Sequence, residues 1–237
     1  QAQLHSSAAP FLMVLSAAPA DEAHLVLVRS DGEAVAFGAN GHGQCEIPSL
    51  PSPGLRYVSA AMGGRHTILL RSDGAALAIG SNEFGQCEVP PVPARGHKYL
   101  VAAAGFWHSV LIRSDGIALA FGRKNEGQCR VPPLAESGQR YVGAAAGWFH
   151  TVLLRSDGQA VAFGENEDNQ CWVPPLPPGQ RYVAAGAGLA HTALLRSDGS
   201  ALAFGGDPGD GRCRVPRLPQ GLSYVGLATG RYHTVFV

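Results

Sequence analysis

Six histidines recur at almost equal intervals along the 237-residue chain, in steps of 42, 42, 42, 41 and 42 residues. Five cysteines recur with a constant step of 42 residues. Proteins build zinc sites and nucleophile–base pairs from imidazole and thiol groups, so these residues are the first candidates for chemistry. They are His24, His66, His108, His150, His191 and His233, and Cys45, Cys87, Cys129, Cys171 and Cys213.

The regular spacing argues against a reactive site. A catalytic or metal-binding site brings different groups together, whereas these residues occur once per unit at equivalent positions. We expect each histidine to begin a strand and to tie its loop to backbone groups by hydrogen bonds. We expect each cysteine to be a small, half-buried apolar residue, too far from its equivalents to form a disulfide. The sequence therefore predicts no catalytic residue, no metal ligand, no cofactor and no enzyme activity.

The two positions before each repeated histidine vary from unit to unit, while the residues around them are retained. They are occupied mainly by arginine and aromatic residues, which contribute most to binding at protein–protein interfaces. As an alternative, one ring of each aromatic pair packs between neighbouring units. We predict a partner-binding site formed by Arg65, Phe106, Trp107, Trp148, Phe149, Leu189, Arg231 and Tyr232.

A second variable set follows the third apolar run of each unit. It is polar and mixed in charge, so we expect a solvated rim there. Its members are residues 41–42, 83–84, 124–126 and 167–169.

Each unit contains short apolar runs separated by turn residues, and none reaches the ~10–12 residues that favour a helix. In the unit that begins at Tyr141, Ser156-Asp157-Gly158 separates the second run from the third. Asp suits a tight turn and Gly tolerates positive φ, so these two runs are expected to pair as a hairpin. A fourth run, Cys171–Val173, ends at two prolines and is predicted to be the outermost strand.

Four strands per ~42 residues are typical of a β-propeller blade, and a fixed period of this length indicates a repeat architecture. The first run of each unit is rich in Ala and Gly, which suits the crowded strand near a propeller axis. The sequence thus predicts an all-β protein and a single domain over residues 1–237. Residues 24–237 are expected to form the repeats, and residues 1–23 a degenerate N-terminal strand region. Within that region, Leu15–Ala18 is interpreted as an inner strand that has lost most of the repeat pattern.

The number of blades follows from the repeat count. Four full units begin at Tyr57, Tyr99, Tyr141 and Tyr182, and the chain ends after one more inner pair. We predict six blades or an incomplete ring, and a fragment of a seven-bladed propeller is the alternative. Residues 3–14 are candidates to cover the open edge of the last pair.

The motif Gly147-Trp148-Phe149-His150-Thr151, with the later Phe-Gly-x-Asn and Gly-Gln elements, resembles the repeat of the regulator of chromosome condensation family. Gly85-Gln86-Cys87-Glu88-Val89-Pro90 is similar to the Gly-Gln-x-x-Val-Pro of short-repeat members, such as propeller-type β-lactamase inhibitors. The resemblance covers about residues 24–237 and implies a β-propeller. It also implies that the loops before the histidines can bind a partner. Members of the family act as exchange factors for small GTPases, ubiquitin-ligase modules, an ultraviolet-B receptor and enzyme inhibitors.

Charge and composition limit the kinds of partner that we expect this chain to bind. The chain has 18 basic and 18 acidic residues and no basic block, which predicts no direct binding to nucleic acid. The apolar run Phe11–Leu15 is far shorter than the ~20 residues of a membrane-spanning helix, so no membrane insertion is expected. Unpaired cysteines favour a reducing compartment such as cytoplasm or nucleus, and the sequence leaves the location otherwise open.

We therefore predict a non-catalytic protein-interaction module or scaffold subunit that binds another protein. Regulation of an enzyme, by nucleotide exchange on a small GTPase or by inhibition, is the alternative. Ultraviolet-B reception is a third. It requires a tight tryptophan cluster, and one of the three tryptophans, Trp172, falls on the predicted outer strand.

Overall fold

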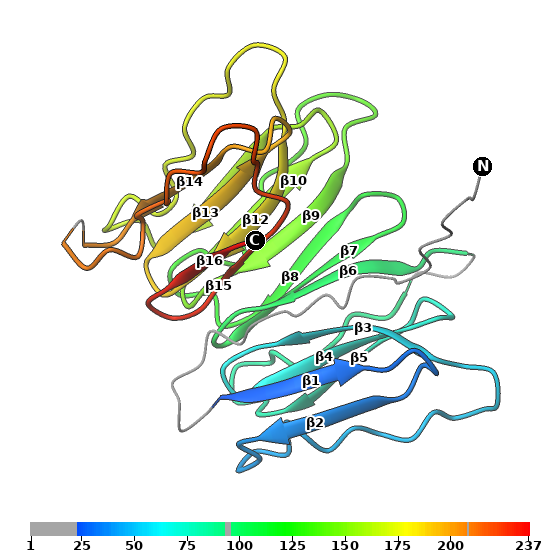
Figure 1. The fold of residues 1–237 in the computed structure, drawn as a ribbon. Coiled ribbons are helices and arrows are strands. Elements are labelled where there is room, and N and C mark those ends of the chain that lie inside the picture. Colours follow the sequence, from blue (N-terminus) through cyan, green and yellow to red (C-terminus); the bar gives the residue numbers. More distant parts are fainter. Residues whose placement is uncertain (1–22, 93–95, 208) are drawn as a thin grey trace, which may run out of the picture.

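The computed structural model describes residues 23–92, 96–207 and 209–237, which form sixteen strands and no helix. The strands make six antiparallel sheets that follow one another along the chain, from blue to red in Figure 1. The first and last sheets have two strands and the four between them have three. In chain order the strands are β1 (His24–Val28) and β2 (Ala34–Gly38); β3 (Tyr57–Met62), β4 (His66–Arg71) and β5 (Ala76–Gly80); β6 (Tyr99–Ala104), β7 (His108–Arg113) and β8 (Ala118–Gly122); β9 (Tyr141–Ala146), β10 (His150–Arg155) and β11 (Ala160–Gly164); β12 (Tyr182–Ala187), β13 (His191–Arg196) and β14 (Ala201–Gly205); β15 (Leu227–Thr229) and β16 (Thr234–Phe236).

The predicted hairpins are present in each complete sheet. In the sheet β9–β10–β11, Thr151 of the central strand lies opposite Ala146 on one side and Phe163 on the other. The turn between β10 and β11 is held by Asp157, whose Oδ1 accepts a hydrogen bond from the Gln159 N–H at 3.0 Å. Gly158 follows at φ 89°, a conformation that residues with a Cβ rarely adopt. The all-β class and the repeated blades of the prediction are confirmed.

The complete blades hold three paired strands, one fewer than predicted. The segment expected to form the fourth strand makes local hydrogen bonds instead: Trp172 N–H donates to Asn169 O and Val173 N–H donates to Cys171 O, each at 3.0 Å. Pro174 and Pro175 then follow and have no N–H for a strand ladder. The segment is therefore a turn and an outer loop rather than a strand.

The first strands of successive blades come together around one cavity of about 390 Å³, and each contacts the next. These are β3, β6, β9, β12 and β15. The residues that face the cavity are mostly small, as in Ala102, Ala144 and Ala185. Small side chains permit this convergence, which explains why each unit begins with an Ala- and Gly-rich run.

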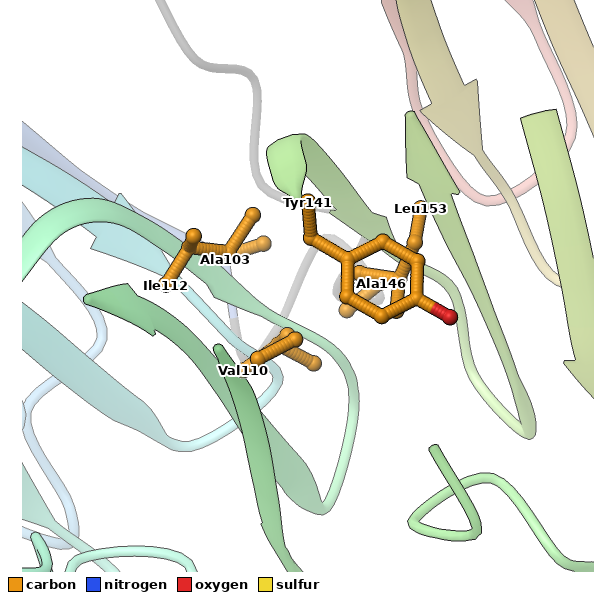
Figure 2. Close-up of a cluster of buried hydrophobic side chains, with 7 residues drawn as sticks. Ala103, Val110, Ile112, Tyr141, Ala146 and Leu153 are labelled. Atoms are coloured by element: carbon orange, nitrogen blue, oxygen red, sulfur yellow. The ribbon is translucent and has the colours of Figure 1, made fainter. Parts of the chain in front are cut away.

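The hydrophobic core lies between neighbouring sheets. Figure 2 shows Ala103, Val110 and Ile112 of one blade beside Tyr141, Ala146 and Leu153 of the next. Burial of a larger aliphatic side chain, such as Val110, Ile112 or Leu153, contributes roughly 1.5–3 kcal/mol. A blade cannot bury both of its faces alone, so the stability of this protein depends on blade stacking.

Two predictions for the N-terminal region, the strand at Leu15–Ala18 and the covering role of residues 3–14, lie outside the described residues. The number of blades and the extent of the domain over residues 1–237 stay predictions. The part of the chain that the structure describes contains no helix that could cross a membrane.

Candidate functional site

The repeated histidines connect each blade to the next. His66 Nε2 lies 2.9 Å from Ser109 Oγ in the following blade, and that hydroxyl donates to the Gln86 carbonyl at 2.7 Å. Because the hydroxyl has one proton and gives it to the carbonyl, Nε2 must be the protonated ring nitrogen. The equivalent pairs, at 2.7–3.0 Å, are His24–Thr67, His108–Thr151, His150–Thr192 and His191–Thr234.

Burial keeps these imidazoles neutral. It lowers the pKa of His66, His108 and His150 to about 3, and that of His191 to about 4. We expected the imidazoles to bond to backbone groups of their own loops, and this prediction is wrong. The Gly63 N–H bonds to His66 O, and the next N–H in that loop bonds to Gly105 O in the following blade. The loop backbone is already satisfied, so the ring reaches the hydroxyl of the neighbour.

A glycine stands three residues before each of these histidines except His24, where Asp21 stands instead, and this glycine permits the contact. A Cβ on Gly105 would lie 2.4 Å from His108 Cε1 and 2.3 Å from the Gly147 carbonyl oxygen of the next blade. Both distances are far below van der Waals contact. Glycine thus allows the loops of adjacent blades to touch, and it brings the two variable residues of one loop close to those of the next.

The cysteines have a structural role as well. All five are free and half-buried, and the Cys87 Sγ lies 3.2 Å from the Ser81 carbonyl oxygen. Burial raises the pKa of Cys87, Cys129 and Cys213 to about 11 and that of Cys171 to about 12. A thiol with so high a pKa is a poor nucleophile at neutral pH. Within the described ranges, no group of three or more His, Cys, Asp or Glu side chains could hold a metal ion.

The variable residues before the histidines form a connected aromatic cluster. The Phe106 ring stacks on Trp148 of the next blade at 4.1 Å between centroids, and it meets Trp107 edge-on at 4.2 Å. Phe149 lies 5.6 Å from Trp107, and Leu189 packs against the same group. Phe106 is 4% and Trp148 8% exposed, whereas Trp107, Phe149 and Leu189 are half-buried. The first ring of each aromatic pair is thus buried, as the alternative interpretation had it, and the second is accessible.

Arg231 and Tyr232 of the last sheet extend the cluster. The guanidinium carbon of Arg231 lies 4.1 Å from the centre of the Trp148 ring and 4.7 Å from that of Tyr232. Tyr232 is 50% exposed. The remaining predicted residue, Arg65, is half-buried and follows Gly64, where a Cβ would come within 2.5 Å of the Phe106 ring.

Sequence reasoning missed two members, Phe84 and Arg123. The guanidinium of Arg123 lies 4.9 Å from the Trp107 ring and 5.0 Å from the Phe149 ring, and Phe84 lies 5.9 Å from Trp107. Both follow the third strand of their blades, in or beside the set interpreted as a solvated rim. We call the following eight residues the aromatic–arginine cluster: Phe84, Phe106, Trp107, Arg123, Trp148, Phe149, Arg231 and Tyr232.

The direction of the strands could have placed these two residues beside the predicted site. In an antiparallel three-stranded blade the loop after the first strand and the loop after the third lie at the same end of the sheet. Arg123 also occupies a position that holds Ala39, Ser81 and Glu165 in other units, so it varies as much as the residues before the histidines.

Comparison with known proteins agrees with this architecture. The family model described as "Regulator of chromosome condensation (RCC1) repeat" matches residues 57–86 and 142–170. Two units of the chain thus match the RCC1 repeat, and the described residues form repeated antiparallel blades, as the resemblance of its motifs predicted. Comparison with curated protein sequences finds no significant match.

Three solved structures share the fold. The ectodomain of the Physcomitrella patens receptor kinase CR4 aligns with a TM-score of 0.68 at 16% identity, over 95% of this chain and 58% of that one. Prp20p from Saccharomyces cerevisiae gives 0.72 at 20% identity over 90% and 67%, and human WBSCR16 gives 0.72 at 17% over 90% and 69%. The chain thus spans little more than half of the moss ectodomain.

Proposed function

We propose that this protein is a non-catalytic protein-interaction module, or a scaffold subunit, that binds a protein partner through the end of the blades that carries the aromatic–arginine cluster. One observation carries the proposal. The buried rings of Phe106 and Trp148 form a rigid floor, and Trp107, Phe149 and Tyr232 present accessible ring surface above it. Large rings held in place before binding lose little conformational entropy on contact with a partner.

The flanking residues Arg65 and Leu189 complete the proposed binding surface. Both are half-buried and occupy the equivalent loop of other blades. The repeated histidines and cysteines serve the scaffold, so these residues are not part of the proposed surface. The balance of 18 basic and 18 acidic residues supports a protein partner rather than nucleic acid.

A related fold supports the proposal. The solved structures of yeast Prp20p include one that reports its binding to Gsp1p and histones and one of Kap60 bound to it. A protein that contains this fold can therefore bind other proteins. The identity of 20% carries the fold and not the partner.

The test is capture of a partner from the native source with matched variants. Trp107→Ala combined with Phe149→Ala removes accessible rings from the cluster, and Phe37→Ala removes an exposed ring of β2 as the control. We expect mass spectrometry to identify a protein that co-purifies with the wild type and the control and is lost from the double variant. Equal capture by all three proteins would exclude this surface.

Regulation of an enzyme is the second candidate, favoured by the likeness to a protein that binds Gsp1p. Faster nucleotide release from a member of a small-GTPase panel would support it, and unchanged release from every member would exclude exchange activity.

Ultraviolet reception requires a tight tryptophan cluster. Trp107 and Trp148 lie 6.3 Å apart, but Trp172 is 74% exposed on an outer segment.

A further inference from the structure

The Arg231 guanidinium is held by two rings and has no acidic partner among the described residues. It lies over Trp148 at 4.1 Å and Tyr232 at 4.7 Å. Its Nε is buried and makes no hydrogen bond within that part of the chain. The Nε of Arg123 and that of Arg212 are buried and unpaired in the same way, so the feature that sets Arg231 apart is the lack of a carboxylate partner among the described residues.

The other two arginines near these rings differ from Arg231 because each has its own carboxylate. Arg212, 5.2 Å from the Tyr232 ring, pairs with Asp210. Arg123 pairs with Glu126 at 3.3 Å. Arg231 is therefore the one arginine in contact with the cluster rings whose charge no described carboxylate offsets.

We propose that Arg231 binds a single carboxylate of the partner protein, an Asp or Glu side chain or a terminal carboxylate, while an apolar neighbour of that group rests on the cluster rings. This inference rests on the proposed function and names the chemistry of its partner. A cation–π contact uses the charge of the guanidinium and leaves its forked N–H donors available. The two rings fix the orientation of the fork, which favours bidentate binding of a planar carboxylate.

A phosphate group is a poorer fit to this surface. It carries about two negative charges near neutral pH and usually needs more than one cation. The charges of Arg123 and Arg212 are already compensated by Glu126 and Asp210. One uncompensated positive charge matches one carboxylate.

The experiment uses displayed random linear peptides as the probe. Peptides are selected on the full chain, and clones are kept that lose binding to Trp107→Ala but still bind Phe37→Ala. We expect an Asp, a Glu or a free C-terminus at one fixed position among these clones. Amidation, or Glu→Gln at that position, should weaken binding to the wild type about tenfold or more, as loss of a charge-assisted hydrogen bond would.

A double-mutant cycle then assigns the carboxylate to its arginine. Arg231→Met should weaken binding by a similar factor, and the Gln peptide should bind that variant no more weakly than the Glu peptide does. Arg214→Met, at an exposed outer position, is the matched control and should leave affinity unchanged. The peptide arm needs no substitution in the protein, so it holds even if Arg231→Met reduces folding.

The outcomes separate this inference from the proposed function. Peptides that depend on Trp107 but show no acidic preference, or whose acidic group contributes equally with and without Arg231, would overturn the carboxylate inference alone. Failure to select any peptide that depends on Trp107 would contradict the binding surface, and the inference with it.

Discussion

The Phe106 ring stacks on the Trp148 indole of the next blade, with centroids 4.1 Å apart and planes inclined by 29°. The contact joins two loops that the backbone also connects, since the Phe106 N–H donates to Gly147 O at 3.1 Å. The same pair therefore fastens neighbouring blades and supports the accessible rings of the cluster. Structure and proposed recognition depend on the same residues.

Replacing Trp148 should cost stability as well as binding. Trp148→Ala removes a ring that is 8% exposed and leaves a cavity beneath the cluster, so we expect a loss of about 3–5 kcal/mol in the free energy of unfolding. Urea unfolding followed by circular dichroism measures it. Trp172→Ala, at an exposed position, should change stability by less than about 0.5 kcal/mol. Equal effects of the two substitutions would mean that Trp148 is not part of a packed floor.

The Ser109 hydroxyl, which joins two blades, should also contribute to the stability of the fold. Ser109→Ala leaves the His66 Nε2–H and the Gln86 carbonyl without their partner in a fully buried place, and each such group costs about 1–3 kcal/mol. The exposed Ser52→Ala is the control and should be close to neutral. A Ser109→Ala protein with the unfolding midpoint of the wild type would show that the histidine contacts contribute nothing.

Acid should destabilise the fold well before the carboxylates titrate. The pKa of His66, His108 and His150 is lowered by burial from 6.5 to about 3. Below pH 6.5 the unfolded chain binds protons that the folded chain does not, so stability is full above about pH 6.5 and falls as the pH drops toward about 3. Each histidine contributes on the order of 1 kcal/mol per pH unit in this window. Urea midpoints measured from pH 8 to pH 4.5 test this, and a flat profile would contradict buried neutral rings.

The thiols should react slowly while the protein is folded. Burial raises the pKa of Cys87 and Cys129 from 9.0 to about 11, which lowers their thiolate fraction about 100-fold. Ellman's reagent at pH 8 should therefore modify these cysteines slowly in buffer and rapidly in urea. A cysteine that reacts at once in the native protein would point to a chemical role that the structure does not show.

Much of the fold could be predicted because the period of about 42 residues repeats the same physical needs. His108 recurs in every unit, and Gly105 in every unit after the first, since the blades must touch; small residues such as Ala144 recur because the inner strands converge. The fourth strand could not be excluded from residue types alone. The segment forms a turn and not a strand because of local hydrogen bonds, such as that from Trp172 N–H to Asn169 O.

The candidate site was less predictable because variable residues carry no pattern of their own. The sequence marked Phe106 and Trp148 as a possible surface, but their depth depends on how closely adjacent loops pack. Arg123 and Phe84 join the cluster through contacts between blades. A single repeat cannot reveal such contacts.

The most direct test of the account is photo-crosslinking from the proposed surface. A photoreactive phenylalanine analogue replaces Tyr232 in one protein and Phe37 in another, and both are irradiated in an extract of the native source. We predict a discrete crosslinked protein from position 232 that disappears when Trp107→Ala is added, and no such product from position 37. Absence of a product at position 232, or the same product from both positions, would contradict binding through the aromatic–arginine cluster.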